Sequence, residues 1–411
     1  MKRPLRFCMV TTFYPPYHFG GDGVFVHRLA NELAQRGHEV EVVHCRDAYH
    51  LLHPEEPVRS YENHAGVTIH TLHSSLGAVS PLLTQQVGAP LLKARKLRRI
   101  LEGGCFDVIH FHNVSLIGGP GVLAYGNAVK LYTMHEYWLV CPMHILFKDG
   151  REACTKPDCL RCTVAHRRPP QLWRYTGAVE RAVKHVDAFI APSAFVGEMH
   201  AARGLHIPTV HIPMFIPDPP DGNVSVDVPN EGRPYFLYVG RLEKLKGLQD
   251  VIPIFERYDQ ADLLVVGDGN YRVALERLAG GNPRVRFTGA QPYEELARLY
   301  RHARALLVPS LCYETFGQIV LEAFSMHTPV LARNIGALRE LVLQSGGGLL
   351  FSFPDELKGQ MEDLRADSGL RARLAEQGSA YYRAHGTVEH HLERYLGLIE
   401  ALQQRREIVL S

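Results

Sequence analysis

The stretch ALLVPSLCYETFGQIVLEAFSMHTPVLAR, from Ala305 to Arg333, shows the alternation that decides the fold class. Its outer segments, ALLVPS and TPVLAR, are short apolar runs typical of buried strands. Between them a loop, LCYETFG, leads into QIVLEAFSMH, which has the spacing of a helix. A strand, a helix and a second strand in this order predict two parallel strands of one sheet.

The same alternation continues along the chain. RFCMVTTF, EVEVVHC, FDVIHFH, VKLYTMH and DAFIAPS are expected strands of a first domain, and GGDGVFVHRLANELAQRGH is an expected amphipathic helix. YFLYVGR, ADLLVVGDG and VRFTG continue the pattern after a segment rich in Pro, Gly and Asp. We therefore predict an α/β protein with two tandem Rossmann-like, doubly wound domains. The expected parts are residues 1–212, a linker at 213–234, a second domain at 235–388 and an amphipathic helix at 389–411.

Composition narrows the class of protein. The chain has 411 residues, 46% of them hydrophobic and 21% charged, with a formal net charge of +2. The near-zero charge speaks against a nucleic-acid partner. No apolar run has the ~18 residues of a membrane span or the core of a signal peptide, so we expect a cytoplasmic protein. In that compartment the eight cysteines would be mostly reduced.

Glu314 lies in the loop before the expected helix QIVLEAFSMH, and Glu322 lies inside that helix. Gly317 and Gln318 begin that helix, where unpaired N–H groups favour an anion. Carboxylates beside such a site suit a sugar nucleotide, because they accept hydrogen bonds from hydroxyl groups. The alternative is a helix with one N-terminal acid and one exposed glutamate.

Basic residues follow the strand YFLYVGR. Arg241 and Lys246 lie in the next loop, at the carboxyl end of a parallel strand, where ligands of such folds bind. Arg and Lys both bind phosphate. The alternative is a solvated loop with no ligand.

The first strand is followed by the glycine loop HFGGDG, residues 18–23. Gly20, Gly21 and Gly23 allow close approach of a phosphate or sugar. Their spacing does not match G-x-G-x-x-G, which speaks against binding of NAD. His135, at the end of VKLYTMH, is a candidate acid, base or hydrogen-bond donor to a sugar.

These motifs, in this order, resemble the family 4 glycosyltransferases of the GT-B fold over nearly the whole chain. The similar segments are FYPPYHFGGDGVFVHRLANELAQRGHEVEVV, TMHEYW, VGRLEKLKG, VGDGNYRVALERLA, VRFTGAQPYEEL and ETFGQIVLE. The resemblance implies two domains that face each other across a cleft, with the acceptor on the first and a nucleotide diphosphate sugar on the second. It further implies that the C-terminal helix at 389–411 crosses back to the first domain. It also implies a retaining hexosyl transfer that needs no metal or other cofactor, and no D-x-D motif is present.

The resemblance also implies residue roles. Glu322 would hold the ribose, Glu314 the donor sugar, and Arg241 with Lys246 the leaving diphosphate. His135 would contact the donor sugar or assist a glycan, lipid-linked or small-molecule acceptor. Other donor contacts would come from Gly21, Phe316, Gly317, Gln318, Ile319, Gly267 and Gly289. Many members carry an acid where Gly23 stands, a departure that concerns the substrate. A GT-B sugar-nucleotide epimerase and a silent sugar-nucleotide-binding protein are the alternatives.

Four cysteines form a cluster in an expected insertion at residues 141–166. Cys141, Cys154, Cys159 and Cys162 have the spacing C-x12-C-x4-C-x2-C, which suits a structural zinc site. The segment has few apolar residues, so a metal would explain its order. An iron–sulfur cluster, disulfides and independent thiols are the alternatives.

The segment 91–101 predicts a cationic helix. Ala94, Leu97 and Leu101 share one face, and lysines and arginines cover much of the rest. Such a helix would contact an anionic membrane and place the enzyme peripherally on its inner face. The alternative is a surface helix that packs its apolar stripe against its own domain.

Overall fold

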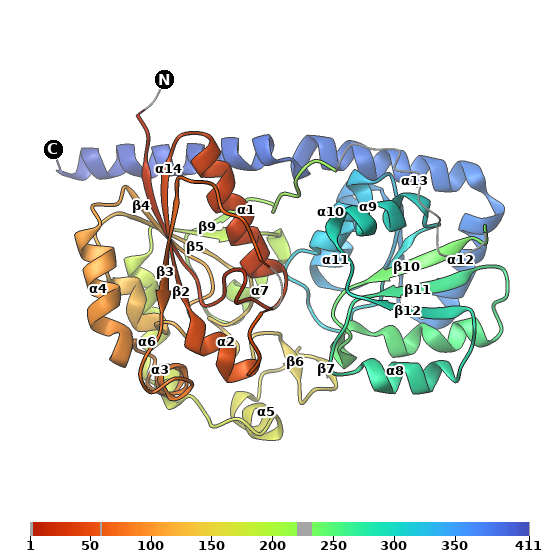
Figure 1. Cartoon of the computed structure of the whole chain (residues 1–411), viewed down its shortest axis with the longest axis horizontal. Coiled ribbons are helices and arrows are strands. Elements are labelled where there is room, and N and C mark those ends of the chain that lie inside the picture. Colours follow the sequence, from red (N-terminus) through yellow and green to blue (C-terminus); the bar gives the residue numbers. More distant parts are fainter. Residues whose placement is uncertain (1–2, 58–59, 220–231, 411) are drawn as a thin grey trace. The chain divides into compact units, whose positions relative to one another are not determined.

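A computed structural model describes residues 3–57, 60–219 and 232–410, which form two compact units (Figure 1). The first unit contains Met1–Ile145, Pro157–Ile212 and Leu392–Ser411, and the second contains Leu146–Lys156 and Pro213–His391. Residues 220–231, most of the expected linker at 213–234, lie outside the described residues. None of the helices in the described ranges combines the length and hydropathy that a bilayer crossing requires.

The first unit is built on a seven-stranded parallel sheet. Its strand order is β3 (Val67–Leu72), β2 (Glu39–Cys45), β1 (Arg6–Val10), β4 (Val108–Phe111), β5 (Val129–Thr133), β8 (Ala188–Ala191) and β9 (Thr209–His211). Its helices include α1 (Gly21–Gln35), α2 (Arg46–Leu52), α3 (Val79–Val87), α4 (Ala94–Gly103), α6 (Ala178–Ala182) and α7 (Ala194–Ala202). The expected strands of the first domain are confirmed, and β3 and β9 are additional strands at the two edges.

Helix α1 follows the amphipathic pattern of its sequence. Phe25, Val26, Leu29 and Leu33 are buried on one face. The helix ends before Gly37, whose φ of 84° is in the left-handed region that glycine tolerates. The expected helix and its stop signal are therefore confirmed.

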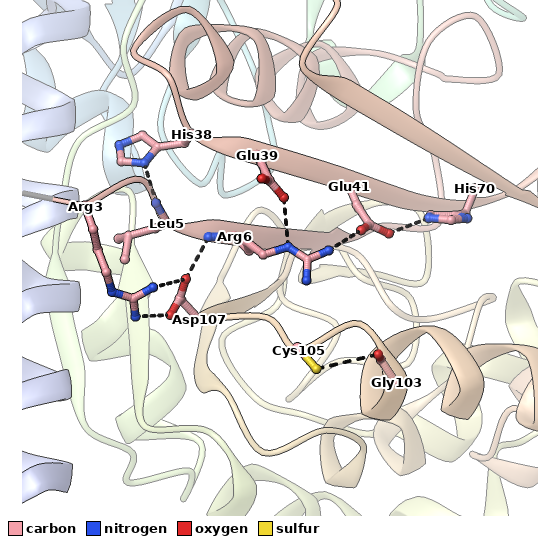
Figure 2. A network of polar contacts seen from close by, with 10 residues as sticks. All are labelled: Arg3, Leu5, Arg6, His38, Glu39, Glu41, His70, Gly103, Cys105 and Asp107. Atoms are coloured by element: carbon pink, nitrogen blue, oxygen red, sulfur yellow. Dashed lines mark hydrogen bonds and ion pairs between the residues drawn. The ribbon is translucent and has the colours of Figure 1, made fainter.

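A polar network joins the strands of the first unit near the start of β1 (Figure 2). The Arg6 backbone N–H donates to Asp107 Oδ2 at 2.8 Å, and its guanidinium donates to Glu39 and Glu41 on β2. Glu41 in turn lies 2.6 Å from Nε2 of His70 on β3. These contacts join β1, β2 and β3 to the residue before β4, while the candidate residues follow the opposite ends of the strands.

The second unit contains a six-stranded parallel sheet. Its strand order is β12 (Val285–Gly289), β11 (Asp262–Val266), β10 (Tyr235–Val239), β13 (Leu306–Val308), β14 (Val330–Arg333) and β15 (Gly348–Phe351). Its helices include α8 (Arg272–Ala279), α9 (Tyr293–His302), α10 (Gln318–Ser325), α11 (Gly336–Ser345), α12 (Pro354–Ala366) and α13 (Ser368–Tyr381). The stretch 305–333 forms β13, α10 and β14, and the two strands are parallel neighbours, as predicted.

The last helix, α14 (Val388–Leu410), contributes to the first unit from Leu392 onward. Its Tyr395 is fully buried, and the Tyr395 ring stacks on Phe7 of β1 with centroids 6.3 Å apart. The Tyr395 hydroxyl lies 2.9 Å from Nδ1 of His110 on β4. The C-terminal segment is thus part of the core of the first unit.

Candidate functional site

Glu314 and Lys246 form an ion pair in the second unit. Glu314 lies in the loop between β13 and α10, and Lys246 ends a short 3₁₀ helix, Lys244–Lys246, after β10. Lys246 Nζ is 2.7 Å from Glu314 Oε1, and Ser310 Oγ donates to the same oxygen at 2.7 Å. Both side chains of the ion pair are 22% exposed. The sequence-predicted cation and acid are therefore direct partners.

The pair determines the charge state of both groups. Burial alone would raise the pKa of Glu314, but the Lys246 charge and the two hydrogen bonds lower it overall. Burial alone would lower the pKa of Lys246, and the neighbouring Glu314 carboxylate raises it overall. At neutral pH the loop thus holds a carboxylate and an ammonium rather than two neutral groups.

Arg241 lies next to this pair. It is exposed, and its guanidinium is 2.8 Å from Glu243 Oε1. Its charge contributes to the lowered pKa of Glu314, which places it within electrostatic reach of that carboxylate. Tyr238, at the end of β10, donates its hydroxyl to the Arg241 carbonyl at 3.0 Å. Arg241, Lys246 and Glu314 are therefore brought together at the carboxyl ends of β10 and β13.

Glycines let the loops of this region pass closely. A Cβ at Gly267, whose φ is 131°, would lie 1.9 Å from the Gly240 carbonyl oxygen. The Gly267 N–H donates to Gly289 O at 2.9 Å, which joins the loop after β11 to the last residue of β12. Gly247 follows Lys246, and a Cβ there would lie 2.0 Å from Pro309 O. Gly267 and Gly289, expected as donor contacts, thus have a structural role in the loops.

Glu322 lies inside α10, and its Oε2 accepts a hydrogen bond from the Tyr300 hydroxyl at 3.1 Å. Tyr300 is fully buried; burial and the nearby Glu322 raise the pKa of its hydroxyl well above the usual value. Gly317, with a φ of 105°, precedes the first residue of α10, Gln318. Phe316 is buried and Ile319 is partly exposed. Helix α10 therefore begins at Gln318, as the sequence predicts.

The first unit contains a second group of candidate residues. His135 follows β5, and its Nε2 is 2.9 Å from Nδ1 of the fully buried His112, at the end of β4. The ring of Phe25, on α1, lies 5.4 Å from that of His135. Gly21 is the first residue of α1 and is exposed. The structure therefore gathers His135, His112 and the first turns of α1.

Gly23 lies in a crowded part of the loop before and at the start of α1. A Cβ at this position would lie 2.9 Å from His18 Cβ and 3.2 Å from the Phe13 carbonyl oxygen. Asp22, the preceding residue, accepts a hydrogen bond from the Gly23 N–H at 2.8 Å. A side chain at residue 23 would require the loop between β1 and α1 to shift.

The structure does not support the expected zinc site. In the described part of the chain, no three or more His, Cys, Asp and Glu side chains are grouped to hold a metal ion. Cys154 belongs to the second unit, whereas Cys141, Cys159 and Cys162 belong to the first. The segment has structure of its own: an antiparallel pair, β6 (Phe147–Lys148) and β7 (Glu152–Ala153), buried Phe147 and Leu146, and helix α5 (Cys159–Ala165). The proposed reason for a metal, a lack of internal packing, is therefore wrong.

Helix α4 also corrects an expectation. Leu97 and Leu101 are buried within the first unit, so the apolar stripe packs against the protein itself. Arg95, Lys96, Arg98 and Arg99 remain exposed. The alternative interpretation of segment 91–101 is thus the correct one for its apolar face.

Sequence reasoning missed several partners of the candidate residues, namely Ser310, Tyr300, His112 and Gly247. Ser310 is in the quoted stretch, and His112 ends an expected strand just as His135 does. The carboxyl end of a strand was therefore an available signal for His112. Tyr300 lies on α9 and is distant in sequence from Glu322, so no local pattern indicates this contact.

Comparisons with known proteins agree with this architecture. The model described as Glycosyltransferase Family 4 matches residues 19–218, and the model described as Glycosyl transferases group 1 matches residues 224–381. The D-inositol 3-phosphate glycosyltransferase of Xylanimonas cellulosilytica is 29% identical over 406 residues, covering 89% of this chain and 88% of the relative.

Solved structures share the fold. Sucrose-phosphate synthase from Thermosynechococcus elongatus matches 99% of this chain and 100% of its own, with a TM-score of 0.74 and 20% identity. HepE of Anabaena, in complex with UDP-glucose, matches 97% of this chain and 100% of its own, with a TM-score of 0.67 and 17% identity. The chain therefore belongs to glycosyltransferase family 4, with the GT-B fold of two Rossmann-like units, and is a glycosyltransferase.

Proposed function

We propose that the chain is a retaining hexosyltransferase that uses a nucleotide diphosphate sugar and a glycan, lipid-linked or small-molecule acceptor. The observation that carries this proposal is the ion pair of Lys246 and Glu314, with Arg241 nearby, at the carboxyl ends of β10 and β13. Ligands of open parallel sheets bind at these ends. A cation and a carboxylate held side by side match a diphosphate and the hydroxyl groups of the sugar attached to it.

The transfer breaks the bond between the anomeric carbon and the diphosphate oxygen and forms a bond from that carbon to an acceptor oxygen. The acceptor hydroxyl transfers its proton to an oxygen of the departing diphosphate, which develops negative charge as its bond to the anomeric carbon breaks. Arg241 and Lys246 would stabilise that charge. Glu314, whose pKa is lowered, would accept hydrogen bonds from the sugar as a carboxylate and would not donate a proton.

Glu322 would bind the ribose hydroxyls, oriented by the hydrogen bond from Tyr300. Phe316, Gly317, Gln318 and Ile319 surround the start of α10, where N–H groups and the helix dipole favour phosphate oxygens. Gly267 and Gly289 would shape the loops around the base. These roles assign the donor to the second unit.

The first unit would bind the acceptor. His135 would contact the donor sugar or assist the acceptor, with His112 beside it. Gly21, at the exposed start of α1, would approach the phosphates. We assign catalysis without a metal ion, because charge stabilisation by Arg241 and Lys246 can take the part that a cation plays elsewhere.

We also propose a cytoplasmic location at the inner membrane face. The exposed cations of α4 (Arg95, Lys96, Arg98 and Arg99) support attraction to anionic lipids. A lipid-linked acceptor would then be within reach of the enzyme.

The test is a donor panel in which UDP-, GDP- and ADP-sugars are incubated with and without candidate acceptors, and the released nucleoside diphosphate is measured. Acceptor-dependent release, with the anomeric configuration retained by NMR, supports the proposal. Conversion of the donor without an acceptor would instead indicate an epimerase, and binding without turnover would indicate a silent protein. The activity should persist in EDTA.

A further inference from the structure

Helix α3 has its polarity reversed with respect to an ordinary surface helix. Ser80, Thr84 and Gln85 are buried in the first unit together with Pro81, whereas the leucines and valines of the helix are exposed. The exposed ones are Val79, Leu82, Leu83 and Val87. A surface helix normally buries its apolar face, so this arrangement needs an explanation.

Hydrogen bonds on the buried side fix this orientation. Lys93 Nζ donates to Ser80 Oγ at 2.5 Å, and Thr84 Oγ1 donates to the Ser80 carbonyl at 3.1 Å. Trp173 Nε1 donates to the carbonyl of Gln85 at 2.8 Å. The Thr84 contact lies within α3, but Lys93 and Trp173 lie outside it, so rotation of the helix to bury its leucines would break these two contacts and leave buried polar groups unpaired, which is costly. The exposed apolar face is therefore a stable property of the fold.

The apolar face continues on both sides of α3. We define the α3 surface as Leu76, Val79, Leu82, Leu83, Val87, Leu91 and Leu92, whose exposed fractions lie between 38% and 52%. Leu91 has a φ of 30°, a strained conformation for a residue with a side chain. Neighbouring exposed leucines and valines of this kind mark a binding surface rather than a solvated one.

Positive charge adjoins this surface. Helix α4 follows Leu92 directly and exposes Arg95, Lys96, Arg98 and Arg99. The sequence contains no acidic residue between Glu62 and Glu102, a range that includes the whole α3 surface and all four cations. An apolar patch with cations and without acids is complementary to lipid tails below anionic headgroups.

We propose that the α3 surface inserts into the headgroup region of an anionic bilayer, while the cations of α4 bind the lipid headgroups. The inserting segment is thus residues 76–92 rather than the apolar stripe of α4, which is buried. Charge complementarity favours an anionic bilayer as the partner, because the exposed cations of α4 adjoin the surface and no acidic residue lies between Glu62 and Glu102. This proposal extends the proposed function to a membrane-bound acceptor, but the measurement of membrane binding requires no donor.

The test is co-sedimentation of the full chain with vesicles of phosphatidylcholine alone or with phosphatidylglycerol. The wild type should bind the anionic vesicles, and the double substitution Leu82→Glu, Leu83→Glu should weaken binding by about tenfold or more. Val273→Glu and Leu343→Glu, at exposed apolar residues of the second unit, are the matched controls and should bind like the wild type. Arg95→Gln with Arg99→Gln should weaken binding at low salt more than at high salt.

Two outcomes would overturn the proposal. One is wild-type sedimentation that vesicles of either composition leave unchanged. The other is a wild-type dimer that Leu82→Glu, Leu83→Glu converts to a monomer with no change in lipid binding, which would assign the surface to a second copy of the chain. Turnover of a water-soluble acceptor by the double variant separates loss of membrane binding from failure of the proposed function.

Discussion

Lys246 Nζ lies 2.7 Å from Glu314 Oε1, although the two residues are 68 positions apart in the sequence. Each side chain is the main charge partner of the other, and Ser310 completes the contact. A donor bound as proposed above would therefore meet a preformed pair of opposite charges. Replacement of either residue changes the charge state of the other as well as any contact with the donor.

The first prediction concerns Lys246→Gln. It leaves the partly buried Glu314 carboxylate without its cation, so we expect the pKa of Glu314 to rise and the free energy of unfolding to fall by ~2 kcal/mol at neutral pH. In the wild type, the lowered pKa of Glu314 stabilises the fold at pH values above the pKa that this group has in the unfolded chain. This contribution is lost as the pH falls through the pKa of Glu314 in the folded protein. Urea unfolding at pH 7 and in acid should show a smaller acid-induced loss in the variant.

Lys244→Gln is the control for this experiment. Lys244 begins the same short helix and is exposed, so its loss should change stability by less than ~0.5 kcal/mol. Equal effects of the two substitutions would contradict the importance of the pair. A double-mutant cycle with Glu314→Gln should give a favourable coupling energy.

Glu322→Ala is the second prediction. If Glu322 binds the ribose, the variant should lose most of the thermal stabilisation by the preferred nucleotide, which at ~100 times its dissociation constant is ~2.7 kcal/mol in the wild type. Tyr300→Phe keeps the carboxylate but removes its hydrogen bond, so it should lose less. Glu276→Ala, at an exposed glutamate of α8, should behave like the wild type. Full stabilisation of Glu322→Ala would exclude the ribose role.

The third prediction compares two glycines with positive φ, of which only Gly267 would bring an added Cβ into collision with a neighbouring atom. Gly267→Ala would place a Cβ 1.9 Å from the Gly240 carbonyl oxygen at a φ of 131°. We expect a loss of ~3 kcal/mol or more in the free energy of unfolding. Gly280→Ala also has a positive φ, 57°, but no atom lies within 4 Å of its Cβ, so it should cost only ~1 kcal/mol. Urea unfolding of both variants measures these changes. Equal losses in the free energy of unfolding would contradict the close approach of the loops.

The fourth prediction concerns acid. Burial lowers the pKa of His200 and of His44 to about 4, from an ordinary 6.5. Between these two pKa values each histidine is protonated in the unfolded chain but neutral in the folded protein. The free energy of unfolding therefore falls as the pH falls, by ~2 kcal/mol per histidine between pH 6.5 and 5. His200→Phe should reduce this loss when unfolding is measured at both pH values. His206→Gln, at an exposed position, should leave the pH profile unchanged, and a His200→Phe profile like that of the wild type would refute the prediction.

The fold could be predicted because each sheet is built from continuous apolar runs with loops between them. The edge strands β3 and β9 could not, because Thr68, Ile69 and Thr209 are exposed and their segments lack a buried pattern. The individual acids and cations of the site were visible at strand ends and at a helix start. The pairing of Lys246 with Glu314 was not, since it depends on how two distant loops pack.

Two other expectations show what a local pattern leaves undetermined. The spacing of the four cysteines describes only the chain, whereas a zinc site depends on where the sulfur atoms lie in space. The helix at 91–101 has an apolar stripe, but its sequence does not indicate whether protein or lipid covers it. For α3 the buried side carries Ser80, Thr84 and Gln85, and Lys93 and Trp173, which lie outside the helix, donate hydrogen bonds to the Ser80 hydroxyl and the Gln85 carbonyl.

The contribution of α14 to the first unit means that this unit is not encoded by one continuous segment of the gene. A protein truncated before Pro213 would lack Tyr395, whose ring packs on Phe7 and whose hydroxyl meets His110. The hydrophobic core around β1 and β4 would then be open to water. Recombination between relatives at a single crossover would therefore combine Phe7 of one parent with Tyr395 of the other. A chimera that keeps this packing inherits the last helix together with the first strand.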